Sequence, residues 1–167
     1  VHAFIGPGAL AIYAFAIALP EQMKSLLGVV ADVAFPRLST NESFDVLRSS
    51  LLKKVLRTTI ITFLIVTLYI IIAPFVYKIF FPRYIESIIF SQVFALSLIL
   101  FPFGIFNTAL KAEGNINKIY IYNLTAPIIQ IIVLLSLIPF FGIWGAIYGR
   151  IIGRISNNLL PFFIFQK

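Results

Sequence analysis

The chain has 167 residues, of which 60% are hydrophobic and 11% are charged, with 13 Lys and Arg against 6 Asp and Glu. A soluble domain carries about a quarter charged residues, so this composition excludes an ordinary soluble protein and indicates a membrane protein. The net charge of +7 does not indicate a nucleic-acid partner, because the cations lie mainly at the ends of apolar segments. Cysteine is absent, which excludes disulfides and thiolate nucleophiles, and the single histidine makes a zinc site improbable.

The first apolar segment, residues 8–35, differs from the others because polar residues interrupt its middle. Pro20, Glu21, Gln22 and Lys24 separate two apolar halves. A soluble protein would split this segment into two short helices at Pro20. We favour a single kinked membrane span, because neighbouring helices in a membrane can satisfy the carbonyl that a proline leaves unpaired.

Residues 39–56 are predicted to form a separate amphipathic helix. Ser39 and Glu42 have the spacing of a capping box, and apolar residues from Phe44 to Leu56 fall on one stripe. Such a helix lies either in the lipid headgroup layer or against the protein as a solvated connector. The sequence leaves these two alternatives open.

Three uncharged stretches predict the remaining spans. They contain 20 residues after Arg57, 24 after Glu86 and 31 after Lys118, against the roughly 20 that cross a bilayer as a helix. Residues 139–142, with a proline and a glycine, divide the longest stretch. We therefore predict spans at about 58–80, 87–110, 119–138 and 143–165, and in total an all-α, five-span membrane bundle that forms one transmembrane region over residues 1–167.

Orientation follows from the cations in the loops, because cytoplasmic loops carry the excess of Lys and Arg. If five spans alternate, eight cations lie on the side of the C-terminus and only Lys78 and Arg83 lie on the other side. We predict a multi-pass protein of the inner (plasma) membrane with a cytoplasmic C-terminus. Because Val1 is not an initiator methionine and no signal peptide is recognisable, we interpret the chain as part of a longer protein.

Charged residues inside the spans are the strongest functional signal, because a charge at the bilayer centre costs about 2.5–3.5 kcal/mol on insertion scales. Glu21 and Lys24 lie near the middle of the first span and are three residues apart on one helix face. They either form a pair that neutralises itself or are kept in the span for a function.

Arg150 and Arg154 are four residues apart and share one face of the last span. Arg154 lies roughly 18 Å from the cytoplasmic end of the chain, too deep to reach water fully. Each arginine follows a glycine, Gly149 or Gly153, which lets another helix or a ligand approach closely. Two guanidinium groups that face an interior cavity suit a phosphate or another anion. The alternative is a tilted or shorter span in which both arginines are interfacial cations.

Neutral polar residues inside the spans are predicted to form hydrogen bonds between helices; they are Gln92, Asn107, Asn123 and Gln130.

The sequence lacks the motifs of the common classes of enzyme. Asp32 and Asp45 are the only aspartates, so an Asp-x-Asp metal motif is absent, and neither a Gly-x-Ser-x-Gly elbow nor a phosphate loop occurs. We therefore predict a protein that is not an enzyme and needs no cofactor or metal.

The order of short segments resembles the C-terminal half of O-antigen and exopolysaccharide flippases, which belong to the multidrug/oligosaccharidyl-lipid/polysaccharide exporter superfamily. The resemblance rests on residues 11–16 (AIYAFA), 34–39 (AFPRLS), 80–87 (FFPRYIES), 107–118 (NTALKAEGNINK) and 141–147 (FGIWGAI). It covers nearly the whole chain, although each segment is weak alone. Pro82 departs from the glycine that is usual in the family.

The resemblance implies a transporter of 12 to 14 helices in two lobes around a central cavity, of which the five spans would be the last five of 12. It also implies that the protein moves an undecaprenyl-diphosphate-linked oligosaccharide across the membrane by alternating access. The missing N-terminal lobe, or a separate partner subunit, would then be needed for transport. The resemblance supplies no motif for substrate residues, so Lys24, Arg150 and Arg154 depend on membrane physics alone. They suit the transport that the resemblance implies, because a diphosphate that crosses the bilayer needs cations in the cavity. Glu21 would instead couple this transport to a proton or sodium ion.

Other functions remain open. A multidrug or small-solute exporter of the same superfamily would keep the fold but would need an unpaired acid inside the membrane for a cationic drug. A membrane-bound polymerase or ligase would need a large periplasmic loop, and both loops on that side are short here. A non-catalytic membrane subunit is the remaining alternative.

Overall fold

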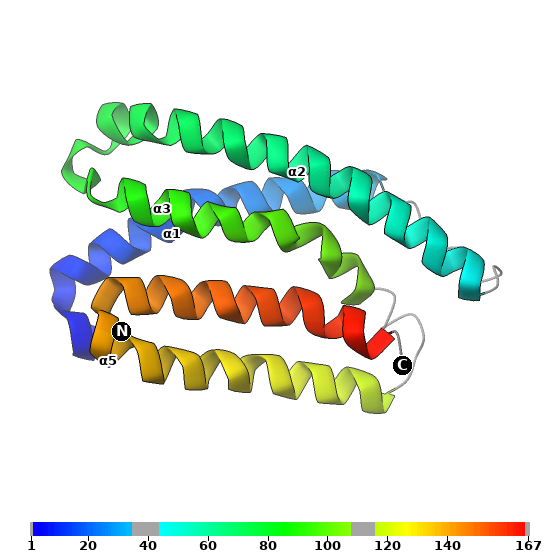
Figure 1. Cartoon of the computed structure of the whole chain (residues 1–167). Helices are drawn as coiled ribbons and strands as arrows, with labels where there is room; N and C mark the ends of the chain where they lie inside the picture. Colours follow the sequence, from blue (N-terminus) through cyan, green and yellow to red (C-terminus); the bar gives the residue numbers. More distant parts are fainter. Residues whose placement is uncertain (1, 35–43, 108–115, 166–167) are drawn as a thin grey trace.

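The computed structural model describes residues 2–34, 44–107 and 116–165, and this part of the chain is helical without any strand (Figure 1). The elements in chain order are α1 (His2–Ala34), α2 (Phe44–Phe80), the 3₁₀ helix η1 (Pro82–Tyr84), α3 (Ser87–Leu96), the 3₁₀ helix η2 (Ser97–Gly104) and α5 (Ile116–Phe165). The predicted all-α class is confirmed. The proposed capping box at Ser39 and Glu42 lies outside the described residues.

Three helical segments are long and apolar enough to cross a membrane: Val55–Phe80, Ser87–Asn107 and Ile116–Phe163. Large apolar side chains are exposed along them, for example Leu64, Leu68, Ile71, Phe75 and Ile79 on α2. Exposed apolar faces of this size suit lipid and would be unfavourable in water. The chain therefore has the properties of a membrane protein. Helix α1 is not among the three segments found in the described part of the chain.

Helix α2 corrects the prediction of a separate amphipathic helix. Residues 44–56 are the first turns of α2, and they continue without a break into the apolar segment that ends at Phe80. The physical reason is that residues 44–73 contain neither glycine nor proline, so nothing interrupts the backbone hydrogen bonds between the charged and the apolar part.

Helix α5 is a hairpin of two antiparallel arms, residues 116–141 and 143–165 (Figure 1). The chain reverses at Gly142, whose φ of 55° and ψ of −123° are accessible to glycine. The arms touch closely at glycines. A Cβ atom at Gly145 would lie 2.3 Å from the carbonyl oxygen of Leu137, and one at Gly149 would lie 2.6 Å from Leu134 Cδ2. The two arms contain the segments 119–138 and 143–165 that were predicted as spans.

The segment after η1 combines an α-helix with a 3₁₀ helix. Helix α3 ends at Leu96, and η2 continues the same course from Ser97 to Gly104 (Figure 1). Pro102 lacks an N–H group, so one α-helical hydrogen bond is missing in this stretch, which favours the change of helix type. The sequence predicted the span but not its change of helix type.

Helix α1 packs against α3 and both arms of α5 around a shared apolar core, whose buried members are Tyr13, Ala16, Phe94, Ile138, Ala146 and Ile147. Two hydrogen bonds fix α1 at its N-terminal half. Tyr77 donates to the carbonyl of Phe15 over 2.8 Å, and Ser87 donates to the carbonyl of Ile12 over 3.0 Å. The charged residues Glu21 and Lys24 follow these core residues in the second half of α1.

Polar residues of the spans were predicted to link helices, and two of them do. Gln92 Nε2 donates to the carbonyl of Ile70 over 2.8 Å, and Asn107 Nδ2 donates to the hydroxyl of Tyr122 over 2.9 Å. Asn123 and Gln130 make no side-chain hydrogen bond within the described part of the chain, so for them the prediction is not confirmed.

Candidate functional site

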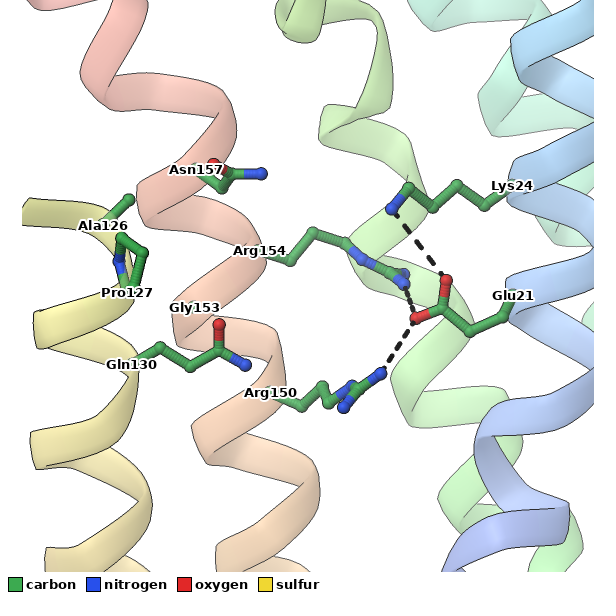
Figure 2. A pocket seen from close by; sticks show the side chains of 9 residues that line it. All are labelled: Glu21, Lys24, Ala126, Pro127, Gln130, Arg150, Gly153, Arg154 and Asn157. Atoms are coloured by element: carbon green, nitrogen blue, oxygen red, sulfur yellow. Dashed lines mark hydrogen bonds and ion pairs between the residues drawn. The ribbon is translucent and has the colours of Figure 1, made fainter. Parts of the chain in front are cut away.

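A cavity of about 320 Å³ lies between α1 and the two arms of α5 (Figure 2). Its lining residues come from α1 (Glu21, Lys24), from the first arm of α5 (Ala126, Pro127, Gln130) and from the second arm (Arg150, Gly153, Arg154, Asn157). The volume falls near the lower end of the range of about 300–1,000 Å³ that is usual for ligand sites. The cavity thus brings together all four charged residues that the sequence singled out.

Glu21 is the centre of this charged group. Its Oε1 atom lies 2.5 Å from Arg154 Nη2 and 3.8 Å from Arg150 Nη2, and its Oε2 atom lies 3.9 Å from Lys24 Nζ. Figure 2 shows the three cations converging on the carboxylate from two elements. Three cations and one carboxylate leave two positive charges in excess among the lining residues. Glu21 and Lys24 therefore do not form an isolated pair that neutralises itself.

Arg154 is held in place by several groups at once. Besides its bond to Glu21, it donates from Nη1 to Ser97 Oγ over 2.8 Å, and its guanidinium carbon lies 4.3 Å from the centre of the Phe94 ring. Ser97 in turn donates to the carbonyl of Phe94 over 2.6 Å. Only 8% of the Arg154 side chain is exposed. Both ends of its guanidinium fork are thus occupied by protein.

The depth of this site follows from Ser97. Ser97 lies at the centre of the apolar segment Ser87–Asn107, ten residues from either end. A guanidinium bonded to Ser97 therefore lies at the middle of that segment. A charge at this depth is costly unless it is paired, which explains why Glu21, a serine hydroxyl and an aromatic ring all contact Arg154.

Arg150 and Lys24 differ from Arg154 because their donors remain accessible. Their side chains are 39% and 43% exposed, and their distances of 3.8 and 3.9 Å to Glu21 are too long for hydrogen bonds. Each contact is an ion pair without a hydrogen bond, so the donors of both side chains are free to bond a ligand. These two residues can therefore offer charged donors to an anion in the cavity, while Arg154 holds Glu21 in place.

Two neutral amides complete the lining. Asn157 accepts a hydrogen bond of 2.5 Å from the hydroxyl of Tyr122, which ties it to the first arm of α5. Gln130 packs over Gly153, where an added Cβ atom would lie only 2.6 Å from its Cγ atom. In Figure 2 the Gln130 amide points from the first arm toward the second, between the turns that bear the two arginines.

The sequence identified Glu21, Lys24, Arg150 and Arg154 but could not pair Glu21 with Arg154, because the two are 133 residues apart. It missed Ser97 and Phe94, which had no signal beyond their place in an apolar span. It assigned Gln130 to hydrogen bonds between helices, whereas in the structure this residue packs against Gly153 and lines the cavity. The prediction that Gly149 and Gly153 allow the close approach of another helix is confirmed, because the first arm of α5 contacts the second arm at both glycines.

The donors of the lining residues suit the binding of an anion. The cavity has guanidinium, ammonium and amide donors, and the described residues contain no group of three or more His, Asp or Glu side chains that could hold a metal ion. Guanidinium groups favour phosphate because their N–H groups match its oxygens in pairs.

Comparison of the chain with protein-family models, with curated proteins and with solved structures finds no match.

Proposed function

We propose that the chain forms one lobe of a membrane transporter that binds the phosphate headgroup of a lipid-linked oligosaccharide and moves it between leaflets by alternating access. The observation that carries the proposal is the cavity that contains Lys24, Arg150 and Arg154 against the single carboxylate Glu21, at the depth of Ser97. An excess of positive charge at mid-membrane depth favours a ligand that brings negative charge with it. The resemblance of the sequence to polysaccharide flippases supports the same function.

The proposal includes five spans in the inner membrane, with α1 and the two arms of α5 each crossing once and the C-terminus in the cytoplasm. An undecaprenyl-diphosphate carrier fits the site because its diphosphate has to pass the apolar interior. The cavity matches a headgroup in size and is too small for a long sugar chain, which would extend beyond it. A cationic drug is a poorer ligand, since the lining already has an excess of positive charge.

The test compares undecaprenyl diphosphate with undecaprenol, which has the same chain without phosphate. The protein in nanodiscs of phosphatidylcholine is expected to bind the diphosphate at least tenfold more tightly, because charged hydrogen bonds contribute about 1.5–3 kcal/mol each. The double substitution Lys24→Gln and Arg150→Gln should remove most of this difference. Binding is measured by native mass spectrometry of the loaded nanodiscs.

Arg83→Gln is the matched control, because Arg83 is an exposed cation in η1 outside the cavity. It should leave the preference for the diphosphate unchanged. Equal binding of both lipids, or an equal loss in the control, would show that the cavity is not an anion site. In the host cell, loss of both Arg150 and Arg154 should also lower the display of surface polysaccharide.

A further inference from the structure

Gln130 is the one lining residue whose side chain has both a donor and an acceptor directed toward the cavity without a bond inside the described part of the chain. Asn157 differs, since its carbonyl oxygen already accepts a bond from Tyr122. The Gln130 side chain is half-buried and lines the cavity, so its amide is open to a ligand. A bound group that accepts one hydrogen bond and donates another would satisfy it.

The position of Gln130 relative to the cations defines where such a group would lie. Gly153 supports the Gln130 side chain, with distances from a hypothetical Cβ atom of 2.6 Å to Cγ, 2.7 Å to Cδ and 3.0 Å to Oε1. Gly153 lies in the helical turn between Arg150 and Arg154. The amide is therefore next to the turn that bears both arginines, so one small ligand can contact Gln130 and Arg150 together.

We propose that Gln130 is a specificity-determining residue that makes the cavity select phosphate esters of polyhydroxylated compounds over simple phosphates. A hydroxyl group is both donor and acceptor and so matches both halves of the amide. Arg150 and Lys24 hold the phosphate, and Gln130 bonds a hydroxyl two or more atoms away from it. This inference rests on the proposed function of the cavity as an anion site and adds the chemistry of the neighbouring group.

Two kinds of natural compound share this chemistry. One is a sugar attached to a phosphate, and the other is the glycerol part of a glycerophospholipid headgroup. Three probes of similar charge separate them: α-D-glucose 1-phosphate, glycerol 1-phosphate and methyl phosphate, of which the last has no hydroxyl outside the phosphate. The full chain in phosphatidylcholine nanodiscs is titrated with each probe at one pH and ionic strength by isothermal titration calorimetry.

A hydroxylated ester should bind about three- to tenfold more tightly than methyl phosphate, as one or two net hydrogen bonds contribute. Gln130→Leu should reduce that ratio to about one, because leucine keeps the volume but neither bonding group. Tighter binding of glucose 1-phosphate assigns the site to a sugar, and tighter binding of glycerol 1-phosphate assigns it to a lipid headgroup. Continued binding of methyl phosphate reports that the substituted protein is still folded.

A pair of glycine substitutions tests the same idea without changing Gln130. Gly153→Ala pushes on the Gln130 side chain, whereas Gly149→Ala pushes on Leu134, four residues away in the same contact between the arms. Gly153→Ala should lower the ratio of affinities, and Gly149→Ala should preserve it. An equal effect of both would mean that only the spacing of the arms matters.

The inference on Gln130 is overturned if methyl phosphate binds as tightly as both hydroxylated esters, or if Gln130→Leu weakens all three probes by the same factor. Either result leaves the anion site intact, since phosphate binding persists. If none of the three probes binds to the unsubstituted protein, the anion site itself is wrong and the proposed function fails with it.

Discussion

Arg150 and Arg154 share a helix face but have different surroundings, and this difference predicts different effects of substitution. Arg154→Met removes the bonds to Glu21 and Ser97 and leaves a carboxylate beside the apolar core. We expect this change to destabilise the protein by about 1.5–3 kcal/mol, the usual contribution of hydrogen bonds to a charged group. A lower midpoint of thermal unfolding in detergent would report the loss.

Arg150→Met is the matched control, because Arg150 is 39% exposed and lies 3.8 Å from Glu21. Its substitution should change stability by no more than about 0.5 kcal/mol while weakening the binding of a phosphate ligand. Arg154→Lys should remain destabilising, since an ammonium group cannot bond Glu21 and Ser97 in the same fork. Equal midpoints for the two methionine variants would contradict the assignment of a structural role to Arg154.

For single residues, the sequence identifies the charged residues of the site but does not predict which of them contact each other. Spacing along one helix relates Glu21 to Lys24 and Arg150 to Arg154, because residues three or four apart share a face. The bond between Glu21 and Arg154 depends on how α1 packs against α5, and no local pattern encodes that. The place of Gln130 in the cavity was not predictable for a related reason: a single glutamine in a span has the same sequence pattern whether or not it lines a cavity.

Among the elements, α2 shows how the protein accommodates a proline inside a membrane helix. Pro74 has no N–H group to donate to the carbonyl of Ile70, and Gln92 Nε2 of α3 donates to that carbonyl over 2.8 Å. Gln92→Leu should therefore leave the carbonyl unpaired and destabilise the protein by about 1–3 kcal/mol. The thermal unfolding midpoint of the purified protein measures this effect.

The control is a double-mutant cycle with Pro74→Ala. Alanine restores the N–H group, so the helix can satisfy the carbonyl of Ile70 by itself. In that background Gln92→Leu should have a smaller effect, and the difference between the two effects is the coupling between the residues. A cycle without coupling would show that Gln92 stabilises the contact between α2 and α3 by packing alone.

The elements were predictable where charge or a breaker marks their ends. Phe80 and Ser87 end and begin helices close to the limits read from the sequence, and Gly142 reverses the chain where glycine and proline suggested a turn. The start of α2 was not predictable from polarity, because a change from charged to apolar residues does not stop a helix that has no breaker. The 3₁₀ form of η2 had only Pro102 as a signal.

For the molecule as a whole, the helices run up and down so that their connections gather at two ends (Figure 1). One end contains η1 and the turn at Gly142, whereas the other contains the starts of α2 and α5 and the end of α5. Lys78 and Arg83 belong to the first end, and the charged first turns of α2 belong to the second. This distribution is what the positive-inside rule requires of a bundle whose second end faces the cytoplasm.

The proposed orientation can be tested directly because the chain contains no cysteine. Ile85→Cys places a thiol beside η1, and Asn117→Cys places one at the start of α5; both positions are exposed and neither change alters the charge. In intact cells whose outer membrane is permeabilised, an impermeant maleimide should label position 85 and not position 117. After lysis of the inner membrane both should react, so lysis is the control for reactivity. Because the cations that set orientation are unchanged in both variants, labelling of position 117 alone in intact cells would place the cation-rich end outside and would reverse the direction in which the cavity meets its substrate.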